Sequence, residues 1–279
     1  MSSTKLDTPT LAEKYDQYLG DSQFNNGLNL IEKLGIETGN NVLDIGCGTG
    51  RLAEYVAKTV GKKGKVTGID PSPHRIKVAS RKGKPSLNLS FELGNGEDLS
   101  RFKNKSFDRV YLNAVFHWIE NKSATLAQIH RILKPGGKLG LTFTSKNIQK
   151  AFSADRQAVD RLLKKEPYAS AVKSDEETPR HPITTDELAL LLINSGFEDI
   201  KLDIKQNTTY YPSAKEYFEK REAGGHGNFL TNVPEELREQ FKADYSKELE
   251  KNKTPQGIEF TNYSQVATAT NNGWNNEKL

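Results

Sequence analysis

The order of apolar and polar residues in the first 145 positions predicts strands and helices in alternation. Continuous apolar runs indicate buried strands, a regular apolar and polar alternation indicates a further strand, and apolar residues three or four apart indicate helices. The predicted strands are residues 42–45, 66–70, 87–93, 107–112 and 138–143, and the predicted helices lie within 11–34, 52–59, 73–81 and 126–133. This spacing predicts a parallel sheet with both faces covered.

The second half departs from that alternation. A capping-box pattern from Thr184 to Glu187 precedes a helix that meets Gly196, and residues 197–204 and 260–270 resume as strands. We therefore predict an α/β fold, a doubly wound, mostly parallel seven-stranded sheet with helical insertions that form a cap. The predicted segments are a core with N-terminal lid helices at 1–145, a polar helical insertion at 146–183, a return to the core sheet at 184–212, a second insertion at 213–257, a last core strand at 258–270 and a tail at 271–279.

A glycine-rich turn follows the first predicted strand, in the stretch VLDIGCGTG at residues 42–50. The stretch contains Gly46, Gly48 and Gly50, and a helical pattern begins at once after it. A turn of this kind brings a ligand close to bare backbone amides at the start of a helix. In an open parallel sheet, ligands bind outside the carboxyl ends of the strands.

Polar residues follow the other predicted strands at the same edge. Asp70 ends the second strand, residues 95–98 follow the third and Asn113 follows the fourth, so we expect all four segments to converge on one site. Asp70 stands 24 residues after Gly46, which suits a carboxylate that binds two ribose hydroxyls. The sequence therefore predicts a nucleoside ligand.

The glycine spacing decides which nucleoside is expected. A dinucleotide site has the pattern G-x-G-x-x-G, whereas this chain has G-x-G-x-G followed by Arg51. Asp44 also puts a carboxylate where a pyrophosphate would lie. A ligand with positive charge and no phosphate fits better, and S-adenosylmethionine carries an ammonium and a sulfonium.

Composition limits the expected cellular compartment and the expected kinds of binding partner. The chain has 279 residues, 40 basic and 36 acidic, for a net charge of +4, and its mean hydropathy is −0.69. Its single cysteine, Cys47, allows no internal disulfide and no pair of cysteine metal ligands, so no metal site is predicted. With no signal peptide, no membrane-spanning run and no basic arm, we expect a cytoplasmic monomer or homodimer with a small-molecule partner, and neither a membrane nor a nucleic acid.

Five stretches in order resemble the motifs of the class I S-adenosylmethionine-dependent methyltransferases: VLDIGCGTG, VTGIDPS, GNGEDL, SFDRVYLNAVFHWI and RILKPGGKL. The resemblance covers residues 10–145 and, more weakly, 184–206 and 258–270. NAVFHWI followed by LKPGG, with a polar insertion after the fifth strand, is most similar to the trans-aconitate methyltransferase-like branch that acts on small molecules. The resemblance implies a Rossmann-like methyltransferase fold and S-adenosyl-L-methionine as cofactor.

The resemblance also implies roles for individual residues. Asp44 would lie near the ammonium of the cofactor, Asp70 would hold the ribose hydroxyls, and Asn113 would offer its backbone carbonyl to the ammonium. Many relatives have an acid where Asn95 stands, and its amide carbonyl would accept from the adenine amino group, with Glu97 or Asp98 sharing that task. The implied cofactor-binding residues are Tyr15, Asp44, Gly46, Cys47, Gly48, Asp70, Pro71, Asn95, Gly96, Glu97 and Asn113.

On the substrate side the sequence leaves alternatives open. His117 is the candidate catalytic residue, as a proton acceptor, or it packs the following helix with Trp118. Tyr15 and Tyr18 form either a lid over the sulfonium or an apolar stripe of the first helix, and Cys47 is expected to pack rather than to act as a nucleophile. The candidate substrate residues are Tyr18, Trp118, Arg180 and Arg221, with His181 and His226 near them, unless they are solvated surface.

The predicted function is transfer of a methyl group, by in-line displacement, to a small metabolite. Acidic metabolites are among the expected acceptors. The motif D/N-P-P-Y/F of many nucleic-acid methyltransferases is absent after the fourth strand, and a single cysteine disfavours arsenite methylation. Two alternatives remain: a protein or RNA methyltransferase that docks its substrate on the insertions, and a module that binds the cofactor without turnover.

Overall fold

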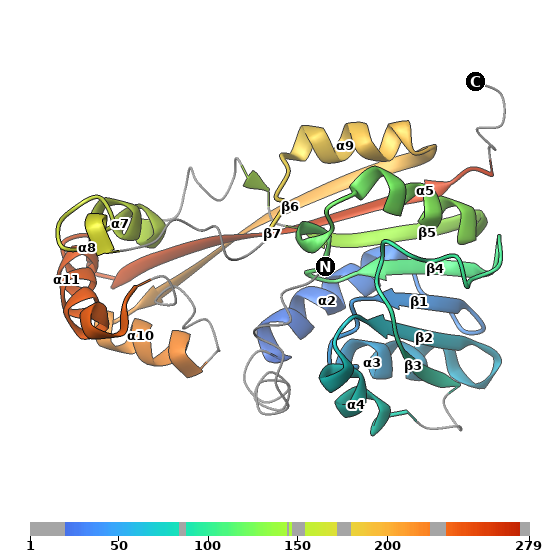
Figure 1. Cartoon of the computed structure of the whole chain (residues 1–279), viewed down its shortest axis with the longest axis horizontal. Coiled ribbons are helices and arrows are strands. Elements are labelled where there is room, and N and C mark those ends of the chain that lie inside the picture. Colours follow the sequence, from blue (N-terminus) through green and yellow to red (C-terminus); the bar gives the residue numbers. More distant parts are fainter. Residues whose placement is uncertain are drawn as a thin grey trace. The chain divides into compact units, whose positions relative to one another are not determined.

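The structure is a computed structural model of the 279-residue chain (Figure 1). It describes residues 20–83, 88–143, 145–146, 154–171, 180–223 and 233–273, without the side chains of residues 20–22, 154–156, 220–223 and 262. Two compact units are present. Unit 1 comprises residues 1–145, 180–204 and 264–279, and unit 2 comprises residues 146–179 and 205–263.

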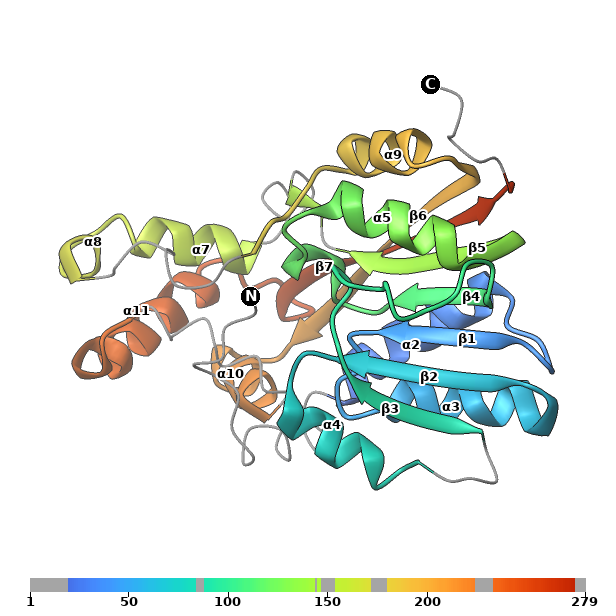
Figure 2. The ribbon, with the colours of Figure 1, turned by 45° about the vertical axis from the view of Figure 1, so that its right-hand side comes forward.

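A seven-stranded sheet has the order β3-β2-β1-β4-β5-β7-β6. The pairs β2–β3, β1–β2, β1–β4 and β4–β5 are parallel, and β5–β7 is antiparallel. Its strands are β1 (Asn41–Ile45), β2 (Lys65–Asp70), β3 (Leu89–Leu93), β4 (Phe107–Leu112), β5 (Leu133–Phe143), β6 (Phe197–Tyr211) and β7 (Ile258–Asn271). The predicted mostly parallel, doubly wound fold is confirmed, and Figure 2 shows β3, β2, β1 and β4 side by side.

Helices cover both faces of the sheet in unit 1. They are α2 (Gly20–Leu34), α3 (Arg51–Val60), α4 (Pro73–Ser80), α5 (Lys122–Ile132) and α9 (Thr185–Asn194), with short 3₁₀ turns η3 (Gly61–Lys63) and η5 (Phe116–Trp118). One buried cluster joins the sheet to α5 and α9 through residues such as Leu126 and Leu188. A second joins the sheet to α2 and α3 through residues such as Leu30 and Val56. The two clusters fix the four central parallel strands from both sides.

The buried face of α3 differs from the predicted one. The spacing of Leu52, Tyr55, Val56 and Thr59 predicts the buried stripe of this helix, but Tyr55 is 43% exposed and Thr59 is exposed. The helix instead buries Leu52, Ala53, Val56, Ala57 and Val60. Alanines allow a helix to lie close to the sheet, and their low hydrophobicity hid this face from the sequence pattern.

Two strand boundaries also differ from the prediction. Leu133 begins β5 rather than ending α5, and the register with β4 shifts between Phe107 and Arg109. The stretch Pro135–Gly137 therefore forms an irregular part of the strand instead of the turn before it. β6 continues to Tyr211 instead of ending at Ile204, because exposed polar residues in its second half carry no apolar alternation.

The predicted capping box at the start of α9 is confirmed. The Thr184 hydroxyl accepts from the Glu187 amide at 3.3 Å, and the Glu187 carboxylate accepts from the Thr184 amide at 2.7 Å. These bonds satisfy amides that have no partner inside the helix. Gly196 follows the helix with a φ of 84°, a conformation that favours glycine.

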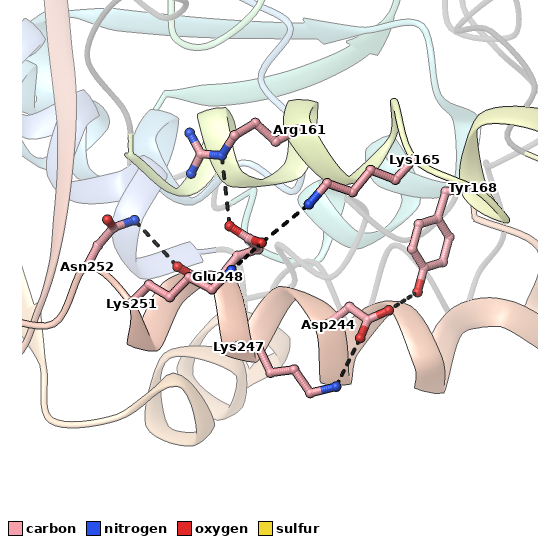
Figure 3. Close-up of polar contacts among 8 residues, drawn as sticks. All are labelled: Arg161, Lys165, Tyr168, Asp244, Lys247, Glu248, Lys251 and Asn252. Carbon is pink, nitrogen blue, oxygen red and sulfur yellow. Dashed lines mark hydrogen bonds and ion pairs between the residues drawn. The ribbon is translucent and has the colours of Figure 1, made fainter.

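Unit 2 contains α7 (Ala154–Leu162), α8 (Tyr168–Ala171), α10 (Ala214–Ala223), η7 (Glu235–Leu237) and α11 (Arg238–Glu250). Its buried cluster is rich in aromatic rings, among them Tyr168, Tyr217, Phe241 and Tyr245. Polar contacts surround this cluster, and Figure 3 shows Glu248 of α11 between the cations of Arg161, Lys165 and Lys251. Unit 2 thus has a core of its own.

The observed unit boundaries differ from the predicted segments. The predicted return to the core ends at 212, whereas the division falls at 204/205, inside β6, and again at 263/264, inside β7. Strands that run through both units give no break in pattern at the boundary. The cap role of the insertions stays a prediction.

Candidate active site

The glycine turn after β1 packs too closely for side chains at two positions. The amides of Gly46 and Cys47 donate to the Ile69 carbonyl at 2.7 and 3.0 Å, which ties the turn to β2. A Cβ on Gly46 would lie 2.2 Å from Cγ2 of Val115, and one on Gly50 would lie 2.5 Å from Cζ of Phe91. Both glycines have positive φ, 75° and 81°. The turn is therefore fixed against the loop after β4 and against β3.

Asp70 lies at the end of β2 with 2% of its surface exposed. Its two carboxylate oxygens accept from the amides of Gly48 and Ser72, each at 2.9 Å. Ser72 in turn caps α4, which has Pro73 in its first turn. Pro71 is exposed between them. The carboxylate is thus held in one orientation, and a carboxylate has lone pairs for more than two bonds.

Asp44 is the second buried carboxyl of this edge, with 2% of its surface exposed. The Tyr111 hydroxyl on β4 donates to Asp44 Oδ2 at 2.8 Å. Burial raises the pKa of Asp44 to about 8; the Tyr111 hydrogen bond acts in the opposite direction, and the charge of Asp70 adds to the rise. Asp44 therefore keeps its proton at neutral pH in this structure.

Cys47 lies inside the turn and is buried. Burial raises the pKa of its thiol well above its usual value, and the nearby carboxyls of Asp44 and Asp70 add to the effect. A neutral thiol is a poor nucleophile. The predicted packing role therefore fits its surroundings.

The Asn95 side chain stabilises the loop after β3 by hydrogen bonds within that loop. Its side-chain oxygen accepts from the amides of Glu97 and Asp98 at 2.9 and 3.0 Å. Gly96 is buried, and a Cβ there would lie 3.1 Å from Cγ2 of Ile45. Glu97 Oε1 accepts from the Asn121 amide at 3.2 Å. The Asn95 carbonyl thus accepts two bonds from its own loop, so its predicted bond to an adenine amino group would compete with them, and that role stays a prediction.

The Asn113 side chain fixes the loop after β4. Its Nδ2 donates to the Gln23 carbonyl of α2 at 3.0 Å, and its Oδ1 accepts from the Thr142 hydroxyl at 2.9 Å. Thr142 also accepts from the Ala114 amide at 2.7 Å. The side chain therefore serves the loop, which agrees with a ligand role for the backbone carbonyl alone.

His117 and Trp118 lie in η5, directly after this loop, and contact the segment at residues 180–181. The Arg180 guanidinium stacks over Trp118 at 4.7 Å, and the His181 amide donates to the His117 carbonyl at 2.7 Å. Burial, then the charges of Arg180 and Lys122, lower the pKa of His117 to about 4. Among the described residues, its Nδ1 is buried without a hydrogen-bond partner. His117 is thus neutral and a weak base at neutral pH.

Four predicted residues lie outside what the structure describes: Tyr15, Tyr18, His226 and the side chain of Arg221. Sequence analysis missed others that the site uses, above all Tyr111 and Thr142. A doubly wound strand order makes β1 and β4 neighbours, but only the observed register pairs Tyr111 with Asp44.

A family comparison agrees with this geometry. Residues 43–141 match the model of a methyltransferase domain. This segment is a methyltransferase domain, and the fold around it is that of the class I S-adenosylmethionine-dependent methyltransferases. The demethylmenaquinone methyltransferase of Tropheryma whipplei (strain Twist) is 40% identical over 106 residues, which are 38% of this chain and 42% of that protein. The chain thus spans about two fifths of that relative's length.

Solved structures extend the likeness beyond the matched domain. The YcgJ protein from Bacillus subtilis has a TM-score of 0.60 at 17% identity, over 88% of this chain and 98% of that one. Phosphoethanolamine N-methyltransferase 2 of Haemonchus contortus, in complex with phosphomonomethylethanolamine and S-adenosylhomocysteine, has a TM-score of 0.57 at 18% identity, over 94% and 57%. These identities show the fold. The trans-aconitate branch stays a prediction.

No helix in the described parts of the chain is long and apolar enough to cross a membrane.

Proposed function

We propose that this methyltransferase binds S-adenosylmethionine at the carboxyl ends of β1 to β4 and transfers its methyl group to a small acidic metabolite. The observation that carries the proposal is the pair of buried carboxyls, Asp44 and Asp70, on either side of a glycine turn. The fixed carboxylate of Asp70 disfavours a pyrophosphate, and Asp44 can balance an ammonium once it is ionised, so the pair suits a ligand that combines a ribose with an ammonium. The residues present therefore fit this cofactor.

In this proposal Asp70 holds the ribose hydroxyls, because its orientation is fixed by Gly48 and Ser72. Asp44 and the Asn113 carbonyl receive the ammonium, while Gly46 lets the methionine part approach the backbone. Asn95 donates its NH₂ to a ring nitrogen of the adenine, since its carbonyl is engaged by the loop. Glu97, Gly96 and Pro71 line the same edge, and Tyr15 is proposed as part of a lid.

When bound, the cofactor supplies a methyl group already activated by its sulfonium, so the protein mainly orients the reactants and excludes water. His117 is too weak a base at neutral pH to activate an alcohol efficiently, because a general base works best near the operating pH. A carboxylate acceptor needs no base. Arg180, which stacks over Trp118, is the residue that we propose to bind such an anion, and a guanidinium matches a carboxylate in geometry.

The relatives support a small acceptor. By their names, demethylmenaquinone and phosphoethanolamine methyltransferases act on small molecules. Tyr18 and Arg221 belong to the proposed acceptor side. The demethylmenaquinone relative covers only part of this chain, so the acceptor is proposed as a class rather than as that compound.

Incubation with S-adenosylmethionine labelled on its methyl group tests the proposal, with dialysable and retained fractions of a cell extract offered separately. We expect label in the dialysable fraction, and less of it with Arg180→Ala when the acceptor is anionic. Label only in the retained fraction would favour a protein or RNA substrate. Cofactor binding with label in neither fraction would contradict enzymatic transfer and favour a sensor.

A further inference from the structure

Asp44 and Tyr111 form a hydrogen-bonded polar pair inside the sheet. They face each other in register on β1 and β4, and the Tyr111 hydroxyl donates to Asp44 Oδ2 at 2.8 Å. Tyr111 is fully buried and Asp44 is 2% exposed. Because Asp44 directly precedes Ile45 and the glycine turn, the carboxyl lies at the inner end of the proposed cofactor site.

The groups around this pair bring negative rather than positive charge. Asp70 on β2 and Cys47 in the turn are the titratable neighbours from those elements. Burial raises the pKa of the Tyr111 phenol, and the Asp44 charge adds to the rise. From α2 and α3, the same face receives apolar side chains such as Leu30 and Leu52. Two cations lie on neighbouring helices. Arg51 of α3 stacks over the Phe24 ring, and the charge of Arg75 on α4 lowers the pKa of the Cys47 thiol by less than burial raises it.

A buried carboxyl with one neutral donor is stable as the acid and not as the anion. The pKa of Asp44, about 8, expresses this balance. A cationic ligand group reverses it, because an opposite charge nearby favours the ionised form. Tyr111 acts in the same direction, since its hydrogen bond stabilises the carboxylate.

We propose that the Tyr111–Asp44 pair couples cofactor binding to release of a proton. The ammonium of S-adenosylmethionine enters with its three protons, the Asp44 O–H bond breaks, and that proton leaves to solvent, so that a carboxylate–ammonium pair remains. Tyr111 is a positioning residue that holds the carboxylate and lowers the cost of its ionisation. This inference rests on the proposed function, since it assumes that the cofactor binds at this edge.

Calorimetric titration with S-adenosylmethionine tests the coupling, in two buffers of different ionisation enthalpy. Between pH 6 and 7 the amino group of the cofactor is protonated, so proton release reports on the protein. We expect close to one proton released at pH 6.5 and an affinity that rises about tenfold per pH unit in this range. Binding without proton release and with a flat affinity would overturn the proposal.

Two variants test whether Asp44 and Tyr111 are the residues that couple cofactor binding to proton release. Asp44→Asn is expected to bind more weakly, with no proton release and little pH dependence. Tyr111→Phe is expected to lose more affinity at pH 6.5 than at pH 8.5, because removal of the hydrogen bond raises the pKa of Asp44. An equal loss at both pH values would mean that Tyr111 is only structural. The ratio to wild type at each pH cancels the titration of the cofactor itself.

Tyr168→Phe is the matched control, because the Tyr168 hydroxyl also donates to an aspartate, Asp244, at 2.8 Å in unit 2. It should leave proton release and affinity at wild-type values. Thermal unfolding of each variant confirms that it is folded. Failure of wild type to bind the cofactor at all would overturn the proposed function, whereas binding without proton release overturns only the coupling.

Discussion

In unit 1 the Tyr111 hydroxyl donates to Asp44, and in unit 2 the Tyr168 hydroxyl donates to Asp244 over the same distance, 2.8 Å. The two carboxyls respond in opposite ways: the pKa of Asp44 is raised to about 8, while that of Asp244 is lowered, chiefly by the Tyr168 hydrogen bond. Asp44 is 2% exposed, whereas the Asp244 side chain is 32% exposed and contacts Lys247 (Figure 3). Burial, not the hydrogen bond, decides whether the pKa of the carboxyl is raised or lowered. A buried acid of this kind suits a site that binds a cation.

The largest expected effect is on the pH dependence of stability. Folded Asp44 keeps its proton up to about pH 8, whereas its ordinary pKa is 3.8, so folding takes up a proton between these values. The free energy of unfolding therefore falls as pH rises through this window, by up to about 1.4 kcal/mol per unit from this group. Asp44→Asn should remove that contribution, as measured by urea unfolding at stepped pH.

Asp244→Asn is the counterpart and should behave in the opposite way. Its lowered pKa contributes stability above pH 3.8 that is lost as the pH falls further, so the variant should differ from wild type in slope only in acid. Equal slopes for Asp44→Asn and wild type between pH 4 and 8 would show that Asp44 is ionised in the folded protein.

The next largest expected effect is on cofactor affinity, which should fall for a variant in unit 1 and not for one in unit 2. Asp70→Ala removes the proposed ribose contacts and should weaken S-adenosylmethionine binding by about 2 kcal/mol, roughly 30-fold. Asp244→Ala should leave the affinity unchanged. Calorimetric titration of both variants makes the comparison, and unchanged affinity for Asp70→Ala would remove this residue from the ribose site.

A smaller effect is expected on stability from the two tyrosines. Tyr111→Phe leaves a fully enclosed carboxyl without its donor and should lower the free energy of unfolding by about 1–2 kcal/mol. Tyr168→Phe should cost less than about 1 kcal/mol, since water can reach Asp244. Denaturant unfolding at pH 7 compares them, and a larger loss for Tyr168→Phe would reverse the ranking by burial.

The smallest effect is expected at Glu248. Its carboxylate contacts Lys251 at 2.8 Å, Lys165 at 3.6 Å and Arg161 at 3.9 Å, and all three cations are largely exposed. The Lys251 hydrogen bond is the main cause of the lowered pKa of Glu248. Glu248→Gln should lower Tm only slightly, and added salt should shrink the difference. A salt-independent loss would point to packing instead of charge.

The sequence predicted the parts of the fold that depend on local pattern. The strand before the glycine turn, the capping box at Thr184 and the polar ends of the central strands were all visible as short-range signals. The convergence of Gly46, Asp70 and Asn113 followed from the rule that parallel strands end at one edge.

Pairings across the sheet were harder to predict. In the sequence, Tyr111 is one residue of a largely apolar strand. Only the β1–β4 register shows that its hydroxyl donates to Asp44. The donor role proposed for Asn95 depends on loop hydrogen bonds that its residue type does not specify. The second half of β6 carried too few apolar residues to indicate a strand.

A crystal structure with S-adenosylhomocysteine would test most directly whether the carboxyl ends of β1 to β4 bind the cofactor. We predict ribose hydroxyls on the Asp70 carboxylate and the amino group within hydrogen-bond distance of the Asp44 carboxylate or the Asn113 carbonyl. Density for the ligand elsewhere, with no contact to Asp70 and with the glycine turn unchanged, would contradict this assignment.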